Sequence, residues 1–202
     1  MTDTHIHRLG LMGGTFDPIH YGHLMAAAAA LRHFQLDQIL FLPTGRPPHK
    51  RGQHTATPQQ RYEMTLLAVG GQPDFRVSAL ETNRQGYSYT WDTLQYFREE
   101  FPQSQLFFIT GADAILDISS WKNAHQLTKL CTFIAIARPG FDLAGLSRLP
   151  MQISRHIQSL KVPALAISST EIREKIHNGH SANWLTTPAV LSYINNNGLY
   201  RN

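Results

Sequence analysis

The chain has 202 residues, a formal net charge of +4 and 42% hydrophobic residues, which is typical of one globular domain or of one domain with a small subdomain. Its longest apolar run, residues 24–31, is far shorter than the roughly 20 residues that a membrane span needs, and the N-terminus lacks the layout of a signal peptide. The lone cysteine, Cys131, excludes an internal disulfide and agrees with a cytoplasmic location.

Strand-like and helix-like segments alternate along the first 167 residues. Strands are expected at residues 9–12, 38–43, 75–80, 105–110, 131–137 and 162–167, and helices at 22–34, 58–69, 89–101, 112–118 and 123–130. This alternation predicts an α/β, Rossmann-like core over residues 1–167, an open parallel sheet with helices on both faces. Two further expected helices, 168–177 and 188–196, predict a small C-terminal helical subdomain over residues 168–202.

The most informative segment is residues 13–23, Gly-Gly-Thr-Phe-Asp-Pro-Ile-His-Tyr-Gly-His. It places Gly13 and Gly14, which lack a Cβ and would let a ligand approach, at the end of the first expected strand. His20 and His23 follow at the start of an alanine-rich helix. A helix N-terminus attracts phosphate through its unpaired N–H groups and its dipole, and residues three apart share a helix face. In most proteins such a glycine pair is a turn, followed here by two surface histidines. The conjunction here instead favours a nucleotide triphosphate as ligand.

A second candidate phosphate site is residues 168–173. Ser168 and Glu171 have the spacing of a capping box, which places Ser169 and Thr170 in the first turn of a helix with N–H groups available to an anion. Arg173 lies off the expected core face, where it is free to reach the β- and γ-phosphates. Taken alone, this segment would be interpreted as a capped surface helix with a solvated arginine.

Better-known phosphate motifs are absent from the sequence. No Gly-x-x-x-x-Gly-Lys-Ser/Thr motif occurs, and no Gly-x-Gly-x-x-Gly follows the first expected strand. A P-loop hydrolase and a conventional dinucleotide-binding dehydrogenase are therefore disfavoured.

The two candidate segments resemble the (T/H)xGH and ISSTxxR signatures of the nucleotidyltransferase superfamily of α/β phosphodiesterase type. Other segments resemble the bacterial nicotinate-nucleotide adenylyltransferases: residues 47–50, 88–94, 108–113, 121, 138–140 and 193–201. The resemblance covers residues 11–201. It implies transfer of the adenylyl group of ATP to nicotinic acid mononucleotide, by direct in-line attack on the α-phosphate, giving deamido-NAD and pyrophosphate.

The resemblance also implies roles for individual residues. The expected catalytic residues are His20, His23 and Arg173. The implied ATP-binding set adds Gly13, Gly14, Thr15, Phe16, Arg138, Ser168, Ser169 and Thr170. The implied mononucleotide-binding set is Lys50, Thr90, Gly111, Asp113, Trp121 and Lys122. In this set Trp121 stacks on the pyridine ring, backbone N–H groups near Thr90, Trp121 and Lys122 bind its carboxylate, and Asp113 accepts from a ribose hydroxyl.

The expected cofactor is Mg²⁺, bound mainly through the ATP phosphates. No protein ligand is assigned to it, because the pair His20 and His23 lacks a third ligand at metal spacing. The expected partners are ATP and nicotinic acid mononucleotide, without nucleic acid or membrane, and a homo-oligomer is compatible with the sequence. Two alternatives remain open: a pantetheine-phosphate adenylyltransferase, and a basic nucleotide- or RNA-binding module that keeps the fold without the chemistry.

Overall fold

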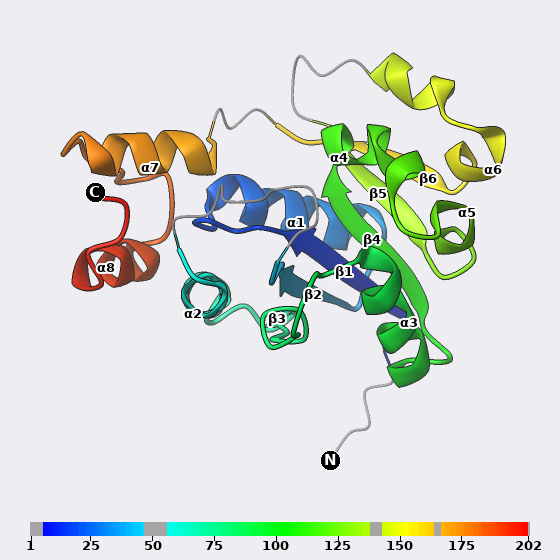
Figure 1. The fold of residues 1–202 in the computed structure, drawn as a ribbon, viewed down its shortest axis with the longest axis horizontal. Helices are drawn as coiled ribbons and strands as arrows, with labels where there is room; N and C mark the ends of the chain where they lie inside the picture. Colours follow the sequence, from blue (N-terminus) through cyan, green and yellow to red (C-terminus); the bar gives the residue numbers. More distant parts are fainter. Residues whose placement is uncertain (1–5, 47–55, 138–142, 164–166, 202) are drawn as a thin grey trace. The chain divides into compact units, whose positions relative to one another are not determined.

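The computed structural model describes residues 6–46, 56–137, 143–163 and 167–201. Six strands form one sheet in the order β3-β2-β1-β4-β5-β6 (Figure 1). Their bounds are β1 Arg8–Gly14, β2 Gln38–Pro43, β3 Phe75–Val77, β4 Gln105–Gly111, β5 Thr132–Ala137 and β6 Ile157–Lys161. This order reverses between β1 and β4, and ligands of doubly wound sheets bind outside the carboxyl ends of the strands at such a reversal. The predicted Rossmann-like fold is confirmed.

The central strands are parallel and buried. β4 pairs with β1 through Leu11 and Phe108, and with β5 through Ile109 and Ile134. These four side chains are all at most 5% exposed, which is typical of parallel strands covered on both faces and explains their continuous apolar sequences. Figure 1 shows β4 between β1 and β5, so the carboxyl ends of β1 and β4 are neighbours.

Some of the helices begin after a capping residue that the sequence marks. The long helices are α1 Tyr21–His33, α2 Pro58–Val69, α3 Thr90–Glu100, α7 Ser169–His177 and α8 Pro188–Asn196, and the short ones are α4 Ala112–Leu116, α5 Ala124–Leu127 and α6 Met151–Ser154. Two 3₁₀ helices, η1 Ile118–Ser120 and η2 Leu143–Arg148, lie among the short ones. Thr57 and Gln60 form a capping box before α2, and Thr187 caps α8, each followed by a proline at the first helical position.

Two of the predicted strands, the sixth and the third, differ from the structure. The strand expected at residues 162–167 is wrong at its described residues 162, 163 and 167, and residues 164–166 lie outside the described residues. The sixth strand is instead β6, which pairs with β5 from Phe133↔Ile157 onward. β6 is an edge strand with only Leu160 buried, so it carries little apolar signal, and Pro163 lacks the N–H that a ladder needs. The third strand, β3, ends earlier than expected because the Ser78 hydroxyl accepts from the Leu80 N–H and turns the chain.

The chain forms two compact units. Unit 1 comprises residues 1–13, 27–40 and 89–164, and unit 2 comprises residues 14–26, 41–88 and 165–202. Each unit consists of three separate segments, whereas the sequence predicts a single division after residue 167. The core over residues 1–167 and the C-terminal subdomain over residues 168–202 therefore stay a prediction. No helix in the described part of the chain is long and apolar enough to cross a membrane.

Candidate active site

The two histidines of the first signature lie together in unit 2. Their rings stack with centroids 3.7 Å apart at an angle of 28°. His20 precedes the first residue of α1 and is 2% exposed, and its backbone N–H donates to Nδ1 of His23 at 3.2 Å. Because Nδ1 of His23 is an acceptor, the neutral tautomer assigned from this bond carries its proton on Nε2. In that tautomer, the Nε2–H of His23 is a hydrogen-bond donor.

The glycine of this signature leaves space for the imidazole of His20. A Cβ on Gly22 would lie 3.0 Å from both Cε1 and Nδ1 of that ring. The His20 ring is buried and stacked on His23, so it could move away from an added Cβ only if the His23 ring moved with it. The spacing His-x-Gly-His thus has a steric reason in this chain.

We expect Gly22→Ala to lower turnover by roughly 10-fold or more, because small misplacements of a catalytic group are costly. The melting temperature should change much less than turnover, because the higher helix propensity of alanine, about 1 kcal/mol over glycine, opposes the steric cost of the added Cβ. The matched control is Gly70→Ala, where the added Cβ would meet atoms no closer than 3.5 Å. Turnover and thermal melting of both variants check this; a Gly22→Ala enzyme with wild-type turnover would contradict it.

The glycines that end β1 differ from the sequence-based interpretation. They were expected to let a ligand approach, but aromatic rings occupy the space beside them: a Cβ on Gly13 would lie 2.7 Å from the Phe108 ring, and one on Gly14 2.6 Å from the Phe16 ring. Phe16 is 2% exposed, has a positive φ of 52° and packs edge-to-face on His23 with centroids 5.0 Å apart. Its side chain supports His23, so a contact from Phe16 to ATP would come from its backbone.

The second signature contacts the first through backbone carbonyls. Nη1 of Arg173 donates to the Asp17 carbonyl at 2.8 Å, and the Ser169 hydroxyl donates to the next carbonyl, that of Pro18, at 2.9 Å. The Thr186 hydroxyl donates to the Ile19 carbonyl at 2.7 Å. Three consecutive carbonyls before His20 thus accept from side chains of the C-terminal segment, which places the two signatures together.

Arg173 is less free than the sequence suggests. Besides its bond to Asp17, its Nη2 donates to the Thr170 hydroxyl at 3.2 Å. A guanidinium has five N–H groups, so two hydrogen bonds fix its plane and still leave N–H groups that can donate to an anion. The arginine is positioned before a ligand arrives.

The N-terminus of α7 has the predicted cap. The Ser168 hydroxyl accepts from the Glu171 N–H at 3.1 Å, and the helix begins at Ser169. Ile172 of this helix packs in an apolar cluster with Ile167 and Ala182. The first-turn N–H groups at Ser169 and Thr170 are therefore the ones that this helix offers to an anion.

In unit 1, the residues expected to recognise nicotinate also lie together. The ammonium of Lys122 forms an ion pair with Asp92 of α3 at 2.8 Å and lies 5.0 Å from the Tyr89 ring. This brings Lys122 beside the N-terminus of α3, whose first residue is Thr90. Trp121 packs edge-to-face on Phe108, with centroids 6.3 Å apart, and is half-buried. The backbone N–H of Trp121 donates to the Ile118 carbonyl at 3.0 Å. This N–H, which was expected to bind the nicotinate carboxylate, is therefore already used.

Gly111 and Asp113 lie where β4 ends and α4 begins. Asp113 is exposed in the first turn of α4, and its Oδ1 occupies the space in which a Cβ on Gly111 would lie, at 2.2 Å. A carboxylate at the carboxyl end of a central strand is well placed to accept from a ribose hydroxyl. Lys50 and Arg138 lie outside the described residues.

Sequence reasoning missed three buried residues around the first signature. Arg61 is 0% exposed and donates to the Thr15 carbonyl at 2.7 Å, and Tyr200 donates to the Asp17 carboxylate at 2.7 Å. Asp17 is itself 2% exposed. No local pattern marks Arg61, because its partners are carbonyls rather than acids.

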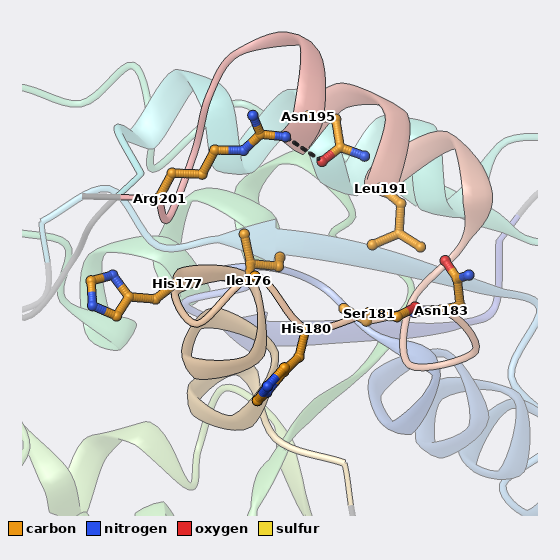
Figure 2. Close-up of a pocket in the computed structure, with 10 residues that line it drawn as sticks. Ile176, His177, His180, Ser181, Asn183, Leu191, Asn195 and Arg201 are labelled. Atoms are coloured by element: carbon orange, nitrogen blue, oxygen red, sulfur yellow. Dashed lines mark hydrogen bonds between the residues drawn. The ribbon is translucent and has the colours of Figure 1, made fainter.

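Figure 2 shows a cavity in unit 2 that contains none of the predicted site residues. Its volume is about 520 Å³, and it lies between the C-terminal end of α7 and α8. The side chains of His177 and His180 point in different directions in Figure 2, while Arg201 points to Asn195, its hydrogen-bond partner at 3.1 Å. The side chains of His177, His180 and Arg201 do not converge on one point of this cavity.

Comparison with known proteins gives consistent results. Residues 11–175 match the cytidylyltransferase-like family. The chain is 50% identical over 199 residues to a probable nicotinate-nucleotide adenylyltransferase of Moorella thermoacetica, covering 96% of this chain and 92% of the relative. It is 49% identical to the corresponding protein of Thermus thermophilus, covering 96% and 100%. A solved structure of Plasmodium falciparum nicotinic acid mononucleotide adenylyltransferase complexed with NaAD has the same fold, with a TM-score of 0.74 at 23% identity over 96% of this chain and 97% of that one.

Proposed function

This chain belongs to the nicotinate-nucleotide adenylyltransferase family, and we propose that it transfers the adenylyl group of ATP to nicotinic acid mononucleotide in NAD biosynthesis. The observation that carries the proposal is the arrangement in unit 2. There the stacked pair His20 and His23 follows the segment whose carbonyls bind Arg173 and Ser169. Donors of three kinds, imidazole, guanidinium and helix N–H, are thus gathered around one short stretch of chain, which suits a polyphosphate.

In the proposed reaction, an oxygen of the 5′-phosphate of the mononucleotide attacks the α-phosphorus of ATP in line. One P–O bond forms to that oxygen, the bond from the α-phosphorus to the bridging oxygen breaks, and pyrophosphate leaves with that electron pair. Such a step needs no protein nucleophile, so positioning and charge stabilisation supply the catalysis. Cys131, the one cysteine, is buried, and burial raises the pKa of its thiol, which agrees with a packing role.

We assign the donors by their chemistry. His20 and His23 bind the α- and β-phosphates, with the Nε2–H of His23 as a defined donor. Arg173, together with the first-turn N–H groups at Ser169 and Thr170, binds the β- and γ-phosphates and stabilises the leaving pyrophosphate. These donors are fixed by bonds within unit 2 before substrate binds, which lowers the reorganisation needed at the transition state.

We propose that Mg²⁺ enters this site bound to the nucleotide rather than to protein side chains. In the described ranges no group of three or more His, Cys, Asp or Glu side chains is arranged to hold a metal ion, and the Asp17 carboxylate already accepts from Tyr200. We therefore propose that the phosphate oxygens and water bind the ion, where it would neutralise charge on the triphosphate.

The nicotinate end of the substrate is assigned to unit 1. Trp121 is proposed to stack on the pyridine ring, and the N-terminus of α3 at Thr90, with Lys122 nearby, to bind its carboxylate. Small nucleotides rather than nucleic acid are the proposed partners, and the cytoplasm is the proposed location, in agreement with the unpaired thiol.

We expect Trp121→Ala to raise the KM for nicotinic acid mononucleotide by roughly 10-fold or more, because the loss of one aromatic stacking contact costs about 1–3 kcal/mol. The KM for ATP should change little. Trp184→Ala is the matched control, since that indole is 87% exposed. Steady-state kinetics with each substrate varied in turn check this; equal changes in both KM values would show that Trp121 supports the fold rather than nicotinate binding.

The function is tested by pyrophosphate release from ATP and Mg²⁺ with three acceptors: nicotinic acid mononucleotide, nicotinamide mononucleotide and phosphopantetheine. We expect the highest kcat/KM with nicotinic acid mononucleotide. Preference for phosphopantetheine would favour the other adenylyltransferase. If none of the acceptors gave pyrophosphate, a nucleotide-binding module without chemistry would be the better description.

A further inference from the structure

Arg61 is an unusual residue to find fully buried. It lies in the second turn of α2 with 0% exposure, and its guanidinium donates to three backbone carbonyls: Nη1 to Thr15 at 2.7 Å, Nη2 to Gly45 at 3.0 Å and Nε to Ala56 at 3.4 Å. Burial lowers the pKa of Arg61, and the attraction of Asp17 opposes that shift. A buried cation stabilises a fold less than an apolar residue of similar size would, so its hydrogen bonds call for another explanation.

Tyr200 contacts the same segment from the C-terminal end of the chain. Its hydroxyl donates to Oδ1 of Asp17 at 2.7 Å, and the two residues are 8% and 2% exposed. Tyr200 has a φ of 67°, a left-handed conformation that few residues other than glycine adopt. Burial raises the pKa of its phenol well above the ordinary range, so the hydroxyl remains a donor. Non-glycine residues in such conformations concentrate at functional sites.

Both residues act on backbone that leads directly to the proposed donors. Asp17, which accepts from Tyr200 through its side chain, accepts from Arg173 through its carbonyl at 2.8 Å. Between Thr15 and Asp17 lies Phe16, whose ring packs on His23. Arg61 and Tyr200 therefore hold the two residues on either side of Phe16.

We propose that Arg61 and Tyr200 are positioning residues for adenylyl transfer, which act through Thr15 and Asp17 to fix the guanidinium of Arg173 and the imidazole of His23. This inference rests on the proposed function and adds two residues that touch no substrate. Arg61 sets the path of the backbone at Thr15, and Tyr200 sets the orientation of Asp17, on which one bond of Arg173 depends.

The test uses Tyr200→Phe, which removes one hydroxyl and keeps the ring. Tyr193→Phe is the matched control, because Tyr193 also donates from its hydroxyl to a carboxylate, that of Glu63. Within the described part of the chain, Tyr193 forms no hydrogen bond to residues 15–17. We expect Tyr200→Phe to lower kcat roughly 10- to 100-fold, the scale of a misplacement of about 1 Å, with little change in the KM for nicotinic acid mononucleotide. Tyr193→Phe should retain wild-type kcat.

Arg61→Lys tests the other positioning residue. Lysine keeps the charge but cannot donate to three carbonyls in one plane, so kcat should fall on the same roughly 10- to 100-fold scale. Val190→Ala, which truncates a fully buried residue in α8, is the control for stability. Its melting temperature should be similar to that of Arg61→Lys or lower. All assays are run well below the melting temperature of every variant. If Val190→Ala lost as much kcat as Arg61→Lys, the effect would be one of stability.

A double-mutant cycle separates positioning from stability. Tyr200 acts through Asp17 on Arg173, so its effect should depend on the arginine. In an enzyme that carries Arg173→Met, adding Tyr200→Phe should lower kcat by less than about 2-fold. The same loss in both backgrounds, or wild-type kcat for Tyr200→Phe, would overturn the inference while leaving the proposed function intact. A wild-type chain that released no pyrophosphate would overturn the proposed function, and this inference with it.

Discussion

Replacement of His23 by alanine is expected to lower turnover roughly 100- to 1,000-fold, the usual consequence of losing one donor to the transition state. The bond from the His20 N–H to Nδ1 of His23 places the proton of the neutral ring on Nε2, which is the proposed donor to phosphate. The KM for nicotinic acid mononucleotide should change little, because His23 is not among the residues assigned to nicotinate binding. Steady-state kinetics of pyrophosphate release measure both quantities.

Two further substitutions separate the catalytic role of His23 from its role at the start of α1. The amide of asparagine reaches the place of Nδ1 and that of glutamine the place of Nε2. His23→Asn should therefore keep the bond to the His20 N–H and the melting temperature but remain as slow as alanine. His23→Gln should recover part of the turnover. If asparagine were as active as glutamine, the Nε2 assignment would be wrong.

Loss of the Arg173 guanidinium should have an effect of similar size. Arg173→Met is expected to lower turnover roughly 100- to 1,000-fold, because the side chain binds the developing negative charge of pyrophosphate in a site that is already organised. Arg173→Lys should fall between methionine and wild type, since a lysine cannot donate to the Asp17 carbonyl, the Thr170 hydroxyl and a phosphate with one planar group.

Lys175→Met is the matched control for Arg173. It removes one positive charge from the same helix, two residues further on. Turnover of this control should stay near the wild-type value at physiological ionic strength, where exposed charges are screened over about 8 Å. Equal losses in the two methionine variants would mean that the overall positive charge of α7, and not the placement of Arg173, matters.

Elements with local signals could be predicted from the sequence. The bounds of α2 and α8 were predicted to the residue, because Thr57-Pro58 and Thr187-Pro188 mark their starts. Continuous apolar runs predicted the bounds of the buried strand β2 to the residue and those of β4 to within one residue. β6 was not, because the sheet decides where an edge strand pairs and its own residues are mostly exposed.

The site was predictable as motifs but not as contacts. The signatures named the histidines, Arg173 and the Ser168 cap, and the structure places all of them in unit 2. The bonds from Ser169, Arg173 and Thr186 to residues 17–19 join positions 151 to 167 residues apart, and no local pattern encodes them. Gly13 and Gly14 were assigned to ligand approach, yet their missing Cβ atoms make room for Phe108 and Phe16, which only the packed structure reveals.

The central claim is that the imidazoles of His20 and His23 and the guanidinium of Arg173 bind one triphosphate. A crystal structure of this chain with Mg²⁺ and a non-hydrolysable ATP analogue measures it most directly. We predict that Nε2 of His23 and a guanidinium nitrogen of Arg173 lie within about 3.2 Å of phosphate oxygens of the same nucleotide. A nucleotide bound with either side chain beyond hydrogen-bond reach of its phosphates would contradict the account.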